Sequence, residues 1–237
     1  MSKKSLRRTP IKQSQPNGYR GRKGRKSRNG RNGRAVKLEK STFTTLKLVF
    51  LAVLIAIIII LQVTGLGFIK IGPVEMTILQ IPVLIGAILL GPVAGVILGG
   101  VFGFISFWTG LSGASPFFFP FFETNPIFFF IMTVITRVLM GWLCGLIFMG
   151  LRRVMSKENI VPFAISGLSG AVLNTLFFMS AFVALFGNTE LFRNLQGDVA
   201  LFPFLVVLVG LNGLIEAGVC ILVGVTISRV LYNFVNR

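Results

Sequence analysis

The sequence predicts an all-α integral membrane protein with six transmembrane helices, both termini in the cytoplasm and a basic arm in front of the first helix. Three observations predict this class. Hydrophobic residues make up 54% of the chain and charged residues only 13%. Long apolar runs alternate with short polar segments, and most of the basic residues lie near the N-terminus. Such a composition is typical of a chain whose helices cross a lipid bilayer.

The apolar runs indicate where the helices cross. A spanning helix needs about 20 mostly apolar residues, because the hydrocarbon core is about 30 Å thick and each helical residue rises about 1.5 Å. Six runs approach or exceed this length: residues 44–64, 74–90, 92–109, 126–151, 160–187 and 201–231. Only Gly91 and Pro92 link the second run to the third, so we expect a tight hairpin there. Pro82 predicts a kink or an irregular start within the second run.

The basic residues orient these helices. Sixteen of the 24 Lys and Arg residues lie within residues 1–47. With six spans, the loop 152–159 and the C-terminus face the same side as this segment and raise its total to 21 basic residues. The loops on the other side then hold only Lys70 and Arg193, beside four acidic residues. The positive-inside rule therefore places both termini in the cytoplasm.

Residues 1–43 form the basic arm, and residues 44–237 form the membrane domain. The arm is rich in Gly, Asn, Ser and basic residues and has almost nothing to bury, so we expect it to be disordered. Taken alone, GRKGRKSRNGRNGR at 21–34 has the composition of a nucleic-acid-binding patch. It has no interleaved aromatic residues and precedes a membrane domain, so we expect anionic lipid headgroups, and no nucleic acid, as its partner.

The residue inventory argues against an enzyme. The chain has no His, which removes the commonest metal ligand and the commonest general base. Its two cysteines, Cys144 and Cys220, are single residues inside apolar runs and lack CxxC spacing, so we expect them to be packing residues. No GxxxxGKS or GxxxxGKT phosphate loop is present. We therefore expect a binding or transport role without a cofactor or metal.

Four polar residues lie deep inside the last three apolar runs: Arg137, Asn174, Asn212 and Glu216. Counted along their helices, they lie roughly 15 to 23 Å from a membrane surface and can form one layer near the middle. Asn212 and Glu216 are four residues apart and share one helical face. A charge at bilayer depth costs roughly 2.5 to 3.5 kcal/mol by insertion scales, so a chain that keeps one is expected to hold something polar with it.

Two interpretations of this layer stay open. In the first, Arg137 and Glu216 pair with each other and the asparagines bridge helices. In the second, the layer binds a small polar ligand. The guanidinium can grip a carboxylate with two bonds, the amides can donate and accept, and the carboxylate can accept from hydroxyls or amides. The two interpretations are compatible if Arg137 and Glu216 form a preorganised pair that the ligand rearranges on binding.

Small and aromatic residues predict further features. Gly95, Gly99 and Gly103 repeat every four residues, so one face of the third helix can pack closely against a neighbour. The loop 110–126 is rich in proline and phenylalanine. It either folds over the outer mouth as a lid that excludes water from a ligand, or anchors the chain at the membrane interface.

Several strings in this sequence resemble those of the substrate-binding membrane subunits, or S components, of energy-coupling-factor (ECF) vitamin transporters. GPVEMTILQIPVLIGAILLGPVAGVILGGVFGF from residue 72 resembles the second and third helices of the branch that binds pantothenate. TRVLMG at 136–141, SGAVLNTL at 169–176 and NGLIEA at 212–217 are also similar to that branch. The resemblance covers residues 44–235.

The resemblance implies a six-helix, substrate-binding module of a bacterial cell membrane that captures a B-type vitamin from outside. A coupling transmembrane subunit and two ATPase subunits would supply the energy for import. Ala52 and Ala56, four residues apart on the first helix, look like the small-residue motif that docks on the coupling subunit. The matching family string often carries His where this chain has Gln80.

Carried over position by position, the resemblance implies that Arg137, Asn174, Asn212 and Glu216 contact the vitamin, with Gln80 beside them. Pantothenate suits these residues, because it has one carboxylate, one amide and two hydroxyls. Folate, riboflavin and niacin are the alternative vitamins. Two other classes of protein also stay open: a self-sufficient ion-coupled carrier of a small organic anion that uses Glu216 as a proton-binding site, and an assembly subunit whose buried charges only hold helices together.

Overall fold

The computed structural model describes residues 29–71, 74–155 and 159–235. The chain divides into two compact units, residues 1–42 and 43–237. Helix α1 (Asn29–Val63) supplies the described part of the first unit. It therefore begins inside the segment where we expected disorder, and the run AVKLEK at 35–40 contains several good helix formers. Residues 1–28 of the expected arm lie outside the described residues, so the division into an arm and a membrane domain stays a prediction.

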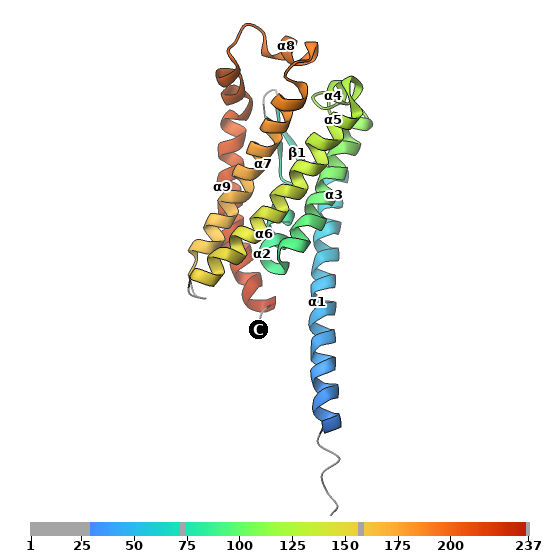
Figure 1. The fold of residues 1–237 in the computed structure, drawn as a ribbon, viewed down its shortest axis with the longest axis vertical. Coiled ribbons are helices and arrows are strands. Elements are labelled where there is room, and N and C mark those ends of the chain that lie inside the picture. Colours follow the sequence, from blue (N-terminus) through green and yellow to red (C-terminus); the bar gives the residue numbers. More distant parts are fainter. Residues whose placement is uncertain (1–28, 72–73, 156–158, 236–237) are drawn as a thin grey trace, which may run out of the picture. The chain divides into compact units, whose positions relative to one another are not determined.

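The second unit is nearly all helical. After α1 its elements are β1 (Phe68–Ile71), β2 (Val74–Thr77), α2 (Gln80–Leu90), α3 (Pro92–Leu111), α4 (Phe119–Thr124), α5 (Pro126–Phe130), the π-helical turn η1 (Ile131–Ile135), α6 (Thr136–Val154), α7 (Val161–Phe186), α8 (Glu190–Gln196) and α9 (Leu201–Val235). Figure 1 shows α4 and α8 at the same end of this unit, whereas α6 ends and α7 begins at the other end.

Four segments of the described chain are long and apolar enough to cross a membrane: Thr45–Val63, Pro92–Leu111, Pro126–Val154 and Val161–Phe186. A fifth is possible if α8 and Leu201–Gly210 count as one span, although the two are bent by 77°. These segments agree with the first, third, fourth and fifth predicted runs. A multi-pass membrane protein is therefore confirmed, whereas six spans and the orientation of the termini stay predictions.

The second predicted run is wrong as a continuous helix. Residues 74–77 form strand β2, which pairs antiparallel with β1 so that Phe68 faces Thr77 and Ile71 faces Val74. Helix α2 begins only at Gln80 and has 11 residues. Apolar and charged residues alternate on both sides of Gly72 and Pro73, which favours a hairpin over a helix. The fold is thus helical with one two-stranded hairpin among the described residues, not all-α.

The link between α2 and α3 is as tight as predicted. Gly91 connects the two helices with φ of 98°, a conformation that suits glycine, and Pro92 begins α3. Pro82 lies in the first turn of α2, where its missing N–H leaves no bond unmade. The predicted irregular start of this helix is therefore its late beginning at Gln80.

Helices α3 and α6 pack backbone to backbone through the predicted glycine face. A Cβ at Gly95 would collide with the carbonyl of Gly141, one at Gly99 with the carbonyl of Arg137, and one at Gly103 with the backbone of Val134. Only glycine allows this separation. The close approach places the start of α6 directly against the middle of α3.

The phenylalanine-rich loop folds inward onto the end of the bundle that carries α8. Phe118 and Phe121 are buried in a cluster with Phe129 of α5 and with Phe178, Phe182 and Phe186 of α7. The ring of Phe121 lies edge-on to the rings of Phe182 and Phe186, at centroid distances of 5.1 and 5.2 Å. This arrangement fits a cover over the bundle end, whereas a simple interfacial anchor would leave these rings exposed.

The sixth predicted run is interrupted. The backbone of Gly210 leaves the helical conformation, so α9 consists of two helical parts that meet at this residue. The part after the break contains the apolar segment Gly213–Val223, which is shorter than a membrane span. Helix α9 packs closely on α7 at Gly167, where a Cβ would lie 2.5 Å from the carbonyl oxygen of Cys220.

Candidate functional site

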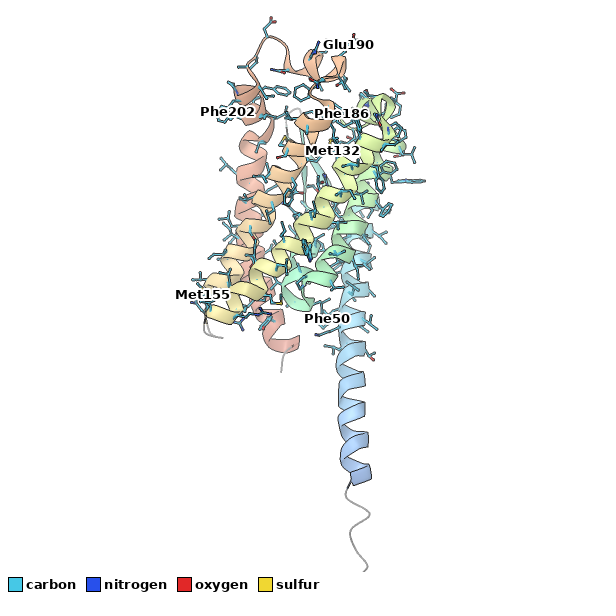
Figure 2. All side chains as sticks on the ribbon, in the orientation of Figure 1. Phe50, Met132, Met155, Phe186, Glu190 and Phe202 are labelled. Atoms are coloured by element: carbon cyan, nitrogen blue, oxygen red, sulfur yellow. The ribbon has the colours of Figure 1, made fainter. Side chains whose placement is uncertain are left out.

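Arg137 lies one residue into α6, directly after the π-helical turn η1. Its side chain is buried, with 3% of its surface exposed. Nη1 donates to the carbonyl of Met132 at 3.0 Å and to Oγ1 of Thr136 at 3.1 Å. The Thr136 hydroxyl donates in turn to the same Met132 carbonyl. Figure 2 marks Met132 on the same end of the bundle as Phe186 and α8. π-Helical turns inside α-helices occur frequently at functional sites.

Two phenylalanine rings lie against the guanidinium of Arg137. Its Cζ is 5.2 Å from the ring centre of Phe102 on α3 and 4.6 Å from that of Phe178 on α7. Such cation–π contacts contribute about 0.5 to 2 kcal/mol each. Nε of Arg137 is buried without a hydrogen-bond partner among the described residues. A buried donor left unpaired costs about 1 to 3 kcal/mol, so an acceptor that reached it would be held firmly.

Glu216 lies on α9, and each of its carboxylate oxygens has a donor. Oε1 accepts from the backbone N–H of Thr77 at 2.9 Å, and Oε2 accepts from Nε2 of Gln80 at 3.2 Å. Gln80 is 2% exposed, and its Nε2 also lies 3.4 Å from Sγ of Cys220. Because the amide nitrogen faces the carboxylate, Oε1 of Gln80 is left as a buried acceptor with no partner among the described residues.

Arg137 and Glu216 do not form a direct ion pair. Within the described chain, no oxygen of Glu216 lies within 4.0 Å of a nitrogen of Arg137, although the two groups attract each other at longer range. Arg137 is held by its own helix and by aromatic rings, and Glu216 by the hairpin and α2. The interpretation in which the charges merely neutralise each other by direct contact is therefore not supported.

Asn174 is buried on α7, one helical turn before Phe178 and one turn after Gly170. These three residues share one face of α7. Phe178 contacts Arg137, and a Cβ at Gly170 would collide with Leu84 of α2. Asn174 therefore lies on the face that runs between α2 and Arg137. Asn212 belongs to α9, but its side chain lies outside the described residues.

A cavity of about 50 Å³ adjoins the Glu216 end of this region. It is lined by Thr77, Gln80 and Glu216, with Ile78, Ile81, Val219 and Cys220 completing the wall. Its volume suits a hydroxyl-sized group or a few waters, because sites for whole drug-sized ligands measure about 300 to 1,000 Å³. The predicted residues therefore divide into a cationic end at Arg137 and an acceptor-rich end at Glu216 and Gln80.

A family model described as the substrate-specific component of ECF transporters matches residues 46–228. The chain belongs to this family. No curated protein matches it. ECF substrate-specific components are transport proteins that bind small molecules and work with energy-coupling modules, so the polar region between α2, α6, α7 and α9 is a candidate substrate site.

Sequence reasoning missed three parts of the candidate site in this ECF component. The backbone N–H of Thr77, the Met132 carbonyl with the Thr136 hydroxyl, and the rings of Phe102 and Phe178 all hold the predicted charges in place. The hairpin that carries Thr77 has a signal in the alternation around Gly72. The π-helical turn has no sequence signal that α-helical periodicity would reveal, because the turn shifts the helical register by only one residue.

The predicted docking residues of this ECF component, Ala52 and Ala56, are both exposed on α1. They lie one turn apart, on the side of the helix opposite to Leu54 and Ile58, which are buried in the core. Their small side chains leave the backbone of α1 accessible to another helix. This placement is compatible with docking on a coupling subunit.

Proposed function

We propose that this S component binds pantothenate and delivers it through a coupling transmembrane subunit driven by two ATPase subunits. The observation that carries the proposal is the buried guanidinium of Arg137, whose Nε has no hydrogen-bond partner in the part of the chain that the structure describes. A chain that maintains such a group is best explained by a ligand with a negatively charged acceptor. The carboxylate of pantothenate supplies one.

The other polar residues suit the rest of the vitamin. Arg137 takes the carboxylate, and Asn174 and Asn212 take the amide and the hydroxyls. Glu216 accepts from a hydroxyl or orients the neighbouring groups. Oε1 of Gln80 offers a second acceptor at the same end, and the adjoining cavity has room for a hydroxyl-sized group. An acceptor-rich end matches a ligand whose far end carries hydroxyl donors.

Capture of a whole vitamin requires movement. The cavity of about 50 Å³ admits one end of the ligand, so the elements around it have to separate before the remainder can enter. The loop 110–126 is placed to take part, because Phe118 lies 6.2 Å, ring centre to ring centre, from Phe178, which contacts Arg137. We propose that this loop acts as the lid.

The membrane arrangement belongs to the same proposal. The module spans a bacterial cell membrane six times with both termini in the cytoplasm, the second and sixth crossings being made by the hairpin with α2 and by the interrupted α9. The basic arm, residues 1–43, lies on anionic lipid headgroups in the cytoplasm. The positive-inside distribution of Lys and Arg supports this orientation.

The coupling subunit docks on the face of α1 that carries Ala52 and Ala56. Replacing Ala52 with Trp fills that face and should abolish copurification with a coupling subunit. Ile57 is also exposed and lies about 100° around the helix from Ala56, so Ile57→Trp is the matched control. If Ala52→Trp assembles as well as the wild type, this docking surface is wrong.

Mass spectrometry of the small molecule released from the purified chain tests the choice of vitamin. We expect pantothenate. Folate, riboflavin or niacin would keep the class of function and overturn the vitamin. An ion-coupled carrier predicts instead pH-dependent uptake by vesicles that contain the chain alone. An assembly subunit predicts that none of these vitamins raises the apparent melting temperature (Tm), because only a ligand that binds the folded state stabilises it.

A further inference from the structure

The turn from Met132 to Arg137 uses up one end of the guanidinium. Nη1 of an arginine carries two hydrogens, and here both have acceptors: the Met132 carbonyl and Oγ1 of Thr136. The end-on edge, formed by Nη1 and Nη2 together, is therefore unavailable for a two-bond grip on a carboxylate. Among the described residues, neither Nε nor Nη2 has a hydrogen-bond partner.

We infer that Thr136 is a positioning residue that commits Nη1 to the helix and so presents the Nε–Nη2 edge of Arg137 to the ligand's anionic group. The inference rests on the proposed function for the identity of that group. Thr136 does not contact the ligand in this account. Its hydroxyl accepts from Nη1 and donates to the Met132 carbonyl, which ties the guanidinium to the π-helical turn.

The chemistry of position 136 makes this role specific. Valine has the shape of threonine but no hydroxyl, so one Nη1 hydrogen would lose its acceptor and the guanidinium could turn its end-on edge toward the site. Serine keeps the hydroxyl and should keep the orientation. Thr133 is the matched control, because it lies on the same turn, is fully buried and donates to the Phe129 carbonyl at 2.8 Å, yet makes no bond to Arg137.

The first experiment needs no ligand. The apparent Tm of the purified chain is measured for T136V and T133V, each in the wild-type and the R137Q background. If Thr136 holds Arg137, T136V lowers the Tm by about 3 °C more in the wild-type background than in R137Q. T133V should have the same effect in both backgrounds. Equal effects of T136V in the two backgrounds would overturn the inference.

The second experiment measures the preference for an anion. Pantothenol replaces the carboxylate of pantothenate with an uncharged alcohol, so the ratio of the two affinities reports the grip on the carboxylate alone. We expect T136V to reduce this ratio about tenfold, because the Nε–Nη2 edge is no longer held toward the carboxylate and its charge-assisted contact weakens, while T136S and T133V preserve the ratio. A merely structural role would weaken both ligands equally and leave the ratio unchanged, which contradicts the inference.

The two experiments separate the inference from the proposed function. If the wild-type chain binds neither compound, the proposed function fails, and the Tm comparison still decides whether Thr136 positions Arg137. If R137Q does not fold, the ratio of affinities in T136V and T136S decides instead. A preserved ratio in T136V, or a ratio lost equally in T136S, counts against the positioning role.

Discussion

Arg137 and Glu216 are both charges among apolar helices, the first buried and the second half-buried, yet their surroundings differ in kind. Both oxygens of Glu216 accept hydrogen bonds, one from the backbone of the hairpin and one from Gln80. Arg137 has only one of its three nitrogens bonded among the described residues, and Nε is buried without a partner. The fold satisfies the carboxylate of Glu216, whereas it holds the guanidinium of Arg137 in place and leaves two of its nitrogens unbonded among the described residues.

This difference assigns the two charges unequal roles. Removing Glu216 leaves the Thr77 N–H without its acceptor and the Gln80 amide with only the Cys220 sulfur, so it should affect the stability of the hairpin as well as the binding of the ligand. Removing Arg137 frees the Met132 carbonyl and the Thr136 hydroxyl, which can still bond to each other. Its loss should therefore fall mainly on ligand binding.

The largest effect is expected from R137Q. The substitution removes the one buried cation among the described residues, which is the group that we propose pairs with the carboxylate, so the affinity for pantothenate should fall about a hundredfold or more. Calorimetric titration measures it. Arg152 provides the control, because its Cζ lies 4.8 Å from the ring of Tyr232, so R152Q also removes an arginine stacked on an aromatic ring. An equal loss in R152Q would mean that the effect is not specific to the site.

A smaller effect is expected from E216Q. Glutamine can still accept from Thr77, and a flip of Gln80 can restore the second bond, so the Tm should hardly change. The affinity should fall about tenfold, because a neutral acceptor replaces a charged one. E216A removes both acceptors and should lower the Tm as well. If E216Q binds pantothenate like the wild type, Glu216 serves the fold alone.

The smallest effect is expected from F178L. The ring of Phe178 contacts the guanidinium, so its loss should weaken pantothenate binding roughly two- to tenfold. Phe182 lies one turn further along α7 and packs in the same cluster without contacting Arg137. F182L should therefore lower the Tm by a similar amount and leave the affinity unchanged. Equal losses of affinity in F178L and F182L would mean that the cation–π contact with Phe178 does not contribute to binding.

Much of the architecture could be predicted from the sequence because it depends on hydrophobicity and small residues. Four of the six apolar runs are confirmed as membrane-capable helices, and the glycine face of α3 packs against α6 as expected. The hairpin at residues 68–77 was missed, because its second strand, residues 74–77, runs directly into the apolar segment of α2 and was interpreted as the start of the helix predicted for residues 74–90. The interruption at Gly210 was missed because one glycine in an apolar run is compatible with a continuous helix.

The candidate site was predictable in its residues but not in its contacts. Arg137, Asn174 and Glu216 stand out as polar residues in apolar runs, and the fold brings their helices together. Their partners could not be read from the sequence: Glu216 bonds across 139 residues to Thr77, and Arg137 bonds within its own π-helical turn. The first depends on the tertiary fold, and the second on a local shift in helical register.

The central claim is the proposal that Arg137 lets this S component bind pantothenate through its carboxylate. Titration of the purified chain alone with pantothenate and with pantothenol tests it most directly. The account predicts saturable binding of pantothenate and at least tenfold weaker binding of pantothenol. Equal affinity for the two compounds, or no binding of pantothenate, would contradict it.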